Sequence, residues 1–170
     1  DSHNQSEAQR VRFQCHRTVL AANSKSFAAL FQASKTQSTG ELRLQRTTPA
    51  TFARYLYYCY AGNLPRMSVL KPDEYLMLAA VAHACKTEAL RQFCVAMLQT
   101  AVTAHNVCDL LLASQYYNEP SSSALLLRFI GVHLKVVATG ASWARLLADV
   151  SGKVGVIVKK LAVIAMKRNP

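Results

Sequence analysis

The sequence predicts a mostly helical α+β fold, in which a small sheet with helical hairpins is followed by an all-helical extension. Residues 11–15 and 41–45 alternate between apolar and polar side chains, as half-buried strands do. Within residues 24–31, 50–61, 72–82 and 87–98, apolar side chains recur three and four positions apart, as on amphipathic helices. Beyond residue 100 the pattern is entirely helical.

Each predicted strand turns its apolar side chains toward the core. In the strand at 41–45 these are its two leucines, and the polar segment 32–40 before it is predicted to be a loop. In the strand at 11–15 the inward side chains are Val11, Phe13 and Cys15.

Two short helices are expected between these strands. The first covers residues 18–22, and Ser24 is a typical N-cap residue for the second. The apolar side chains of the second helix fall on one stripe, formed by Phe27, Leu30 and Phe31.

Thr48 and Pro49 predict the start of a longer helix, because a Thr side chain caps free backbone N–H groups and Pro suits the first helical position. The helix covers residues 50–61 and ends at Gly62. Its apolar residues at helical spacing are Phe52, Leu56, Tyr57 and Tyr60.

Two further helices complete the first hundred residues. One begins at 72–74, where two acids favour the positive end of the helix dipole, and the next is capped by Thr87 and Glu88. The inner residues of the first are Tyr75, Leu78, Ala79 and Ala82. Those of the second are Leu90, Phe93, Cys94, Met97 and Leu98.

Helices then follow one another to the end of the chain. Thr103 is the expected cap of a helix at 104–117, and 121–123 cap a helix that ends near Thr139. A last pair is expected around 143–147 and 154–167.

Charge and composition restrict the class of protein. The 170 residues are 51% hydrophobic, which is enough to bury a core in one domain with a small helical extension. The net charge is +11, so acidic surfaces are attracted. From Arg128 onward there are 8 basic residues and one acid.

Cysteine placement favours a reducing compartment. The five cysteines lie in apolar runs without a Cys-x-x-Cys pair, as reduced buried thiols do. Neither a membrane-spanning run nor a signal peptide is recognised, so we expect a soluble intracellular protein of the cytoplasm, with the cytoskeleton or nucleus as alternatives.

Three motifs in order resemble the BTB/POZ family. Residues 13–31 resemble Phe-x-x-His-(Lys/Arg)-x-Val-Leu-Ala-x-x-Ser-x-x-Phe-x-x-Met/Leu-Phe, 48–64 resemble Pro-x-x-Phe-x-x-x-Leu-x-x-x-Tyr-Thr-Gly-x-Leu, and 74–85 resemble the Leu-Leu-x-x-Ala-x-x-Tyr helix that follows. The signature residues are Phe13, His16, Val19, Leu20, Phe27, Phe31, Phe52, Tyr60 and Gly62.

The helical part resembles the extension of the speckle-type POZ protein group, called the 3-box or the start of a BACK region. This implies a BTB/POZ domain at 9–100 whose first strand is expected to be missing, a 3-box/BACK-like extension at 101–150, and a basic amphipathic helix at 151–170.

The resemblance implies a non-enzymatic interaction module that self-associates and, in many members, binds a cullin. Two departures weaken the cullin interpretation: the loop 32–40 lacks the hydrophobic-x-Glu triplet of cullin-binding members, and Val132 replaces a tyrosine. Asn23 stands where many members carry a basic residue in the pocket between subunits, and that charge would pair with an Asp of the missing strand. When the basic residue and the Asp are both absent, no unpaired charge is buried in the pocket.

We therefore favour a scaffold subunit of a larger assembly, with a cullin-type ubiquitin ligase adaptor and a BTB transcription regulator as alternatives. A homodimer stays open. Partner-binding residues are expected to be Phe31, Gln32, Ala33, Ser34, Tyr58 and Val132.

Two possible functional sites, a catalytic pair and a zinc site, are less well supported than structural roles for the same residues. Neighbours Cys15 and His16 point to opposite faces of a strand and cannot form a catalytic pair. The residues His83, Cys85, Cys94 and His105 fit no compact zinc motif. No catalytic residue, cofactor, metal or small-molecule substrate is expected.

Two surface features stay open. The tyrosines at 55, 57, 58 and 60 lie all around one helix, so at least one ring is expected to face solvent or a partner. The basic C-terminal end either packs plainly or binds a membrane surface or an acidic partner, such as a cytoskeletal polymer or another subunit; nucleic acid is disfavoured because stacking aromatics are lacking. Its residues are Lys153, Lys159, Lys160, Lys167 and Arg168.

Overall fold

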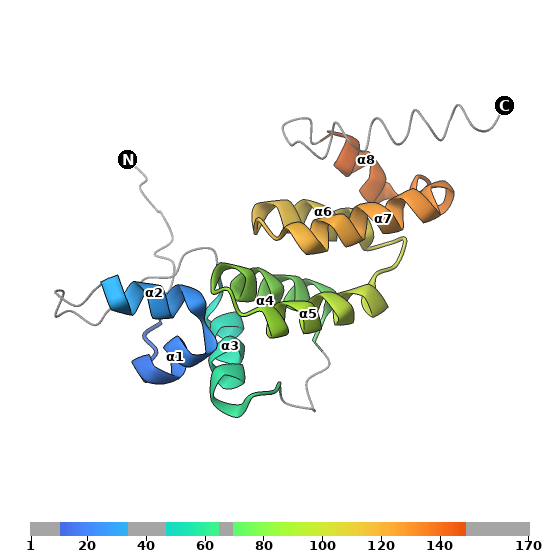
Figure 1. Cartoon of the computed structure of the whole chain (residues 1–170). Coiled ribbons are helices and arrows are strands. Elements are labelled where there is room, and N and C mark those ends of the chain that lie inside the picture. The colour runs from blue at the N-terminus through green and yellow to red at the C-terminus, as the bar shows by residue number, and fades with distance from the viewer. Residues whose placement is uncertain (1–10, 34–46, 65–69, 149–170) are drawn as a thin grey trace, which may run out of the picture.

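The computed structural model describes residues 11–33, 47–64 and 70–148 (Figure 1). Within these ranges the chain forms eight α-helices. They are α1 Arg17–Asn23, α2 Lys25–Ala33, α3 Pro49–Ala61, α4 Pro72–Ala84, α5 Glu88–Ala101, α6 Val107–Tyr116, α7 Pro120–Val137 and α8 Ala141–Ala148. No helix in these ranges is both long and apolar enough to cross a bilayer.

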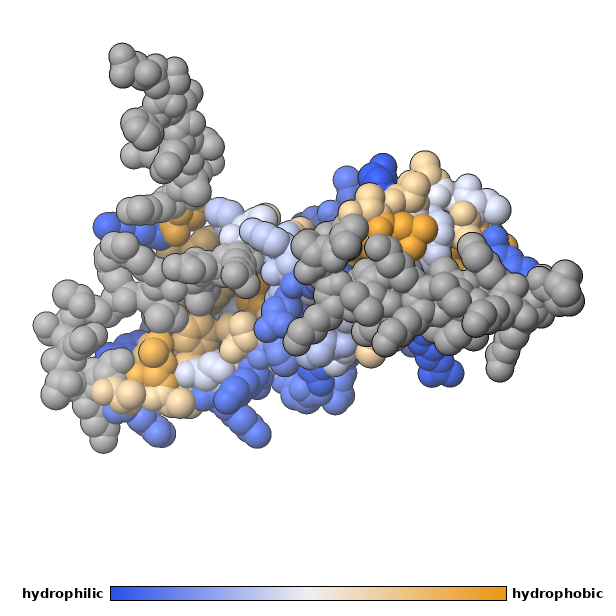
Figure 2. Space-filling model, turned by 90° about the horizontal axis from the view of Figure 1, so that it is seen from above, coloured by the Kyte–Doolittle hydropathy of each residue, from blue (hydrophilic) through white to orange (hydrophobic). Residues whose placement is uncertain are grey.

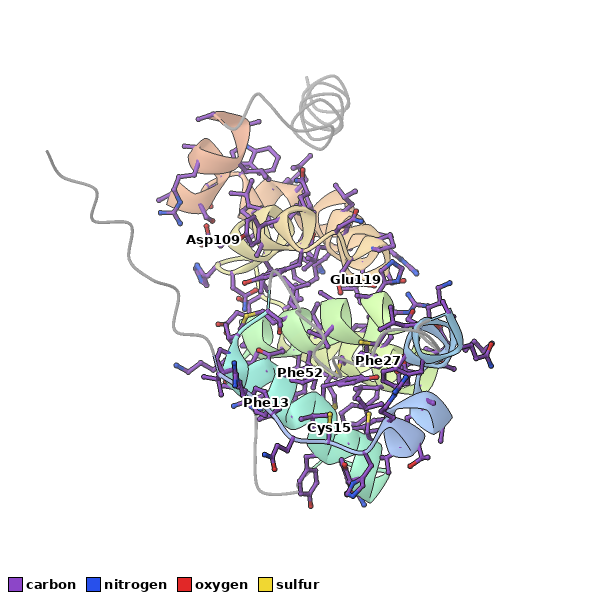
Figure 3. All side chains as sticks on the ribbon, turned by 90° about the vertical axis from the view of Figure 1, so that its left-hand side faces the viewer. Phe13, Cys15, Phe27, Phe52, Asp109 and Glu119 are labelled. Carbon is purple, nitrogen blue, oxygen red and sulfur yellow. The ribbon has the colours of Figure 1, made fainter. Side chains whose placement is uncertain are left out.

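The described ranges contain no strand. Residues 11–16 run without regular secondary structure along α3, where the Phe13 ring packs edge-on against Phe52 with 5.3 Å between centroids (Figure 3). The predicted strand at 41–45 lies outside the described residues. Because a strand is defined by pairing with a neighbour, the small sheet stays a prediction.

Ser24 joins α1 to α2 and also ties them to the turn between α4 and α5. Its hydroxyl oxygen accepts a hydrogen bond from the Phe27 N–H at 3.1 Å, which confirms the predicted N-cap. The same hydroxyl donates to the carbonyl of Cys85. This one buried side chain therefore fixes the start of α2 against a turn sixty residues away.

Both ends of α3 follow the prediction. The Thr48 hydroxyl accepts a hydrogen bond from the Thr51 N–H at 3.1 Å, and Pro49 is the first helical residue. At the other end Gly62 adopts the left-handed conformation with φ 72°, and its N–H donates to the carbonyl of Tyr58 at 2.8 Å.

The start of α4 is held by Glu74. Its carboxylate accepts the backbone N–H of Lys71 at 2.9 Å and pairs with the guanidinium of Arg54 on α3 at 2.8 Å. The backbone hydrogen bond is the main reason that the pKa of Glu74 lies below its ordinary value. The predicted inner face of α4 is confirmed, since Tyr75, Leu78, Ala79 and Ala82 are all buried.

The caps of α6 and α7 differ from the prediction. α6 begins after Asn106, whose side-chain oxygen accepts the N–H of Thr103, so Thr103 is not the cap. α7 begins after Glu119, whose carboxylate accepts the N–H groups of Ser121 and Ser122. The serines therefore do not cap α7. The buried carboxylate of Glu119 accepts hydrogen bonds from the backbone N–H groups of Ser121 and Ser122 instead.

The helices stack in order from one end of the molecule to the other (Figure 1). α1 and α2 pack with α3 at one end, the α4–α5 hairpin lies in the middle, and the α6–α7 pair covers it, with α8 outermost. α4 contacts α3 and α6, while α5 contacts α7. The buried side chains form one apolar cluster that extends from Leu20 to Leu146.

Five side chains expected to face the core are exposed instead. They are Val11, Leu30, Tyr57, Tyr60 and Phe93, with exposed fractions of 47, 37, 47, 50 and 46%. On α3 the inner positions are taken by Tyr55 and Cys59, which are 0 and 6% exposed. α3 is thus rotated relative to the expected stripe, with the Tyr55 hydroxyl hydrogen-bonded to Thr87 in the core.

Candidate protein-interaction surfaces

The last turn of α2 carries three of the predicted partner-binding residues. Gln32 and Ala33 are exposed, while Phe31 is partly buried against the core. The guanidinium carbon of Arg17 lies 4.7 Å from the centre of the Phe31 ring, a cation–π contact. Ser34 lies outside the described residues, and the contacts of this surface with a partner stay a prediction.

The tyrosines of α3 divide between the core and the surface. Tyr55 is fully buried, Tyr58 is partly buried, and Tyr57 and Tyr60 are about half exposed. The expectation that at least one ring faces outward is confirmed by Tyr57 and Tyr60. Tyr58, a predicted partner-binding residue, is partly buried. Tyrosine suits such positions because its ring is apolar and its hydroxyl polar.

His16 anchors residues 11–16 to the end of α3. Its backbone N–H donates to the Tyr60 hydroxyl at 2.8 Å, and its ring nitrogen Nδ1 lies 2.8 Å from the same hydroxyl. The hydrogen-bond partner of His16 lies 44 positions away in the sequence. No local pattern could have shown this, because Tyr60 belongs to another helix.

A buried hydrogen-bond chain explains why Tyr55 faces inward. The Thr87 hydroxyl donates to the carbonyl of Asn23 at 3.0 Å, so the Tyr55 hydroxyl, 3.0 Å from Thr87, is the donor in their bond. Burial strongly raises the pKa of Tyr55. The Asn23 side-chain amide donates to the carbonyls of Val19 and Cys59, each at 3.0 Å, so Asn23 has a structural role.

The thiols behave as core residues. All five cysteines are unpaired, and only Cys15 is partly exposed. Burial raises the pKa of Cys85 to about 11 and that of Cys94 to about 12, so the reactive thiolate is scarce at neutral pH. Among the described residues, no three His, Cys, Asp or Glu side chains gather as metal ligands would.

A buried carboxylate marks the junction between α5 and α7 (Figure 3). Glu119 is fully buried, and its Oε1 lies 3.5 Å from a guanidinium nitrogen of Arg91 on α5. Arg91 also donates to Glu88 and to the hydroxyl of Ser121. Sequence reasoning missed this site; the Glu-Pro pair before three serines was the available signal, but it does not reveal the partner on α5.

The outer side of α7 is the most exposed apolar surface of the extension. Val132, a predicted partner-binding residue, is 71% exposed, and Val136 one turn later is 61% exposed. The Phe129 ring lies 4.4 Å from the ring of His133 between centroids. The predicted basic patch at the C-terminal end lies outside the described residues.

Comparison with known proteins decides the family. The family model of the BTB/POZ domain matches residues 5–102, more than half of the chain. The chain belongs to the BTB/POZ family. BTB/POZ domains bind other proteins and dimerise, so the exposed residues of α2 and α3 described above, which lie within the match, belong to a protein-interaction module.

Several curated BTB/POZ proteins are similar to the chain. BTB/POZ domain-containing protein 6-A of Danio rerio is 32% identical over 114 residues, covering 67% of this chain and 20% of that protein. Human Kelch-like protein 40 is 30% identical over 137 residues, 81% of this chain and 21% of that protein. BTB/POZ and MATH domain-containing protein 6 of Arabidopsis thaliana is 23% identical over 165 residues, covering 89% of this chain and 40% of that protein.

The chain spans about a fifth of the length of the first two of these BTB/POZ relatives. The likeness to Kelch-like protein 40 is longer than the 98 residues of the BTB/POZ match and therefore involves more of the chain than that domain. The assignment of the extension to the speckle-type POZ group, and to a 3-box or BACK region, stays a prediction.

Proposed function

We propose that the chain is a non-enzymatic scaffold that holds several proteins in one assembly. The observation that carries this proposal is the spread of exposed apolar side chains over four helices of the BTB/POZ core and its extension. They are Leu30 on α2, Tyr57 and Tyr60 on α3, Phe93 on α5, and Val132 and Val136 on α7.

Exposed aromatic and aliphatic side chains are common at protein interfaces, where aromatic residues in particular contribute much of the binding energy. Here they occur at separated places on the molecule, and orange patches at more than one place on the face in Figure 2 illustrate this. Separate surfaces allow more than one partner to bind at once, which is the property that a scaffold needs.

The test is affinity purification of the full chain from its native source, with variants on different helices. Tyr57→Lys, Phe93→Lys and Val132→Lys each place a charge in one exposed apolar position. Each variant is expected to lose a different subset of the proteins that co-purify with the wild type. Gln99→Lys, at an exposed polar position of α5, is the matched control and should lose none.

Circular dichroism of the variants checks that the helices remain. If all three apolar variants retained every partner, or if the wild type purified alone, the scaffold proposal would be wrong.

A cullin adaptor is the second candidate. It is favoured by the likeness to Kelch-like protein 40 over 81% of this chain, together with the resemblance of the motifs to a family in which many members bind cullins. The missing hydrophobic-x-Glu triplet after α2 and Val132 count against it. A pull-down with a purified cullin N-terminal domain tests it, and an absence of binding would remove this candidate.

We also propose that the protein works in a reducing compartment such as the cytoplasm. The support is the state of the thiols, since four of the five are buried and none is paired. Fractionation of cells that express the full-length protein tests this location.

A further inference from the structure

We propose that the outer side of α7 binds an acidic amphipathic helix of a partner protein. The inference rests on the proposed function and specifies the chemistry of the partner at one of its surfaces. It is carried by an apolar stripe and by two exposed basic side chains beside the stripe, with which no acid of the described residues pairs.

The apolar stripe is distinct from the fully buried face of α7. The residues of α7 that are buried in the molecule are Ser122, Leu126, Ile130 and Val137. A second apolar line follows a different side of the helix at spacings of four, three and four residues. It consists of Leu125, Phe129, Val132 and Val136.

This second line has the spacing with which two helices pack along a seam. Leu125 and Phe129 are partly buried, while Val132 and Val136 are 71 and 61% exposed. The backbone departs from helical geometry at His133, between the two valines, and both valines nevertheless stay exposed. A partner helix can therefore cover them without displacing any buried side chain of α7.

The charges beside the stripe are basic. Arg128 and Lys135 lie on α7 on either side of the departure from helical geometry at His133, and both are exposed. The carboxylate nearest to Arg128 in sequence is Glu119, which is buried and bound to Arg91. The one nearest to Lys135 is Asp149, which lies outside the described residues. Within the described residues, no acid pairs with Arg128 or with Lys135.

Three arginines elsewhere in the described residues form ion pairs: Arg54 with Glu74, Arg91 with Glu88, and Arg145 with Asp109. Arg128 and Lys135 are exposed beside an apolar line, and no acid of the described residues pairs with them. A helix that brings Leu-like side chains to the stripe and carboxylates to its borders complements both features.

The experiment uses the full chain and two synthetic helical peptides of about three heptads. Both carry Leu along one seam; one carries Glu and the other Lys at the flanking positions. Like charges keep each free peptide from self-associating. The wild-type chain is expected to bind the Glu peptide roughly tenfold more tightly than the Lys peptide, because two exposed ion pairs are replaced by repulsion.

The decisive variant is the double charge reversal Arg128→Glu with Lys135→Glu. It should reverse the preference, so that the Lys peptide binds more tightly than the Glu peptide. A gain of binding cannot come from a misfolded protein. Val132→Ser should weaken the binding of both peptides. Ala124→Ser, at an exposed position of α7 away from the stripe, is the matched control.

Three results would overturn the inference: neither peptide binds, the charge reversal leaves the preference unchanged, or an oligonucleotide displaces the Glu peptide with the same dependence on Arg128 and Lys135. The results that would contradict the scaffold proposal are different from those that would contradict this inference. If partners co-purify but the peptides do not bind, the scaffold survives and this inference is wrong. If the preference reverses but the chain purifies alone, this inference survives without the scaffold.

Discussion

At the scale of single residues, a few polar side chains decide how the apolar helices of this BTB/POZ domain meet. Thr87 links Tyr55 to the carbonyl of Asn23, and Ser24 links α2 to the α4–α5 turn. All of these bonds are buried or partly buried, so a lost partner would leave a polar group without water. Apolar contacts supply attraction here, and the hydrogen bonds select one packing.

Two glycines with different backbone conformations give a test at this scale. Gly131 lies inside α7, and a Cβ added there would meet nothing within 4 Å. We expect Gly131→Ala to raise the free energy of unfolding by about 0.5 to 1 kcal/mol, because alanine loses less backbone entropy in a helix.

Gly62 is the matched comparison. A Cβ there also meets nothing within 4 Å, but φ is +72°. Gly62→Ala should lower the free energy of unfolding by about 1 kcal/mol, since an L side chain is strained in the left-handed region. Urea denaturation of both variants measures the effect, and two shifts of the same sign would contradict the interpretation.

Glu74 gives a pH dependence with a definite sign. Its pKa is lower in the folded protein than in the unfolded chain, first because of the Lys71 N–H and then because of Arg54. Its contribution to stability is therefore complete above the unfolded pKa and is lost as the pH falls below about 4.5 through the folded pKa.

Urea denaturation between about pH 3 and pH 6 is the measurement. The wild type should lose stability more steeply with acid than Glu74→Gln, which keeps the shape but has no charge to protonate. Parallel curves for the two proteins would show that Glu74 contributes nothing to the acid sensitivity.

At the scale of helices, their positions were largely predictable and their rotations were not. Local signals mark the start of α3 at Thr48 and its end at Gly62, because caps act within a few residues. Tyrosines occupy all sides of α3, so hydropathy alone cannot choose the inner one. That choice depends on Thr87, which is 32 positions from Tyr55.

The interaction surfaces were predictable only in part, for the same reason. Val132 was identified because it replaces an expected tyrosine, and it is exposed. Leu30 and Phe93 were assigned to the core from their spacing, yet they are exposed. A stripe predicts which residues share a face, but the neighbouring helices decide how much of that face is covered. Arg91 and Glu119 escaped notice because their partnership joins α5 to α7.

The contact of Arg91 with Glu119 should hold the first turn of α7 against α5. We expect Arg91→Ala to lower the free energy of unfolding by about 2 kcal/mol, because it leaves a fully buried carboxylate without its cation. Glu88→Ala removes the exposed partner of the same arginine and should cost less than about 1 kcal/mol.

Amide hydrogen exchange adds a local measurement. In Arg91→Ala, the amides of Ser121 and Ser122 should exchange faster than in the wild type. Equal loss of stability in both variants, with unchanged exchange at these amides, would mean that the buried pair does not fix the junction.

At the scale of the whole molecule, the BTB/POZ core and the helical extension share one hydrophobic cluster. α4 packs against α6, and α5 packs against α7. Leu76 on α4 and Leu111 on α6 are both fully buried in this cluster. The extension is therefore expected to unfold together with the core.

Replacing either leucine by alanine tests this continuity. Leu76→Ala and Leu111→Ala should each lower the free energy of unfolding by about 3 kcal/mol and shift one common transition. Trp143 on α8 is the single tryptophan of the chain, so its fluorescence follows the extension, while circular dichroism follows all helices. Two separate midpoints would show that core and extension unfold independently.

The hydroxyl of Ser24 has a consequence for the order of events on the ribosome. Its acceptor, the carbonyl of Cys85, is synthesised 61 positions later. α1 and α2 emerge before the α4–α5 turn that completes their contacts. Until then, Leu20 and Phe27 lack the neighbours that bury them in the folded protein. Chaperones that shield apolar segments during translation would therefore act on α1 and α2 before α4 and α5 have emerged.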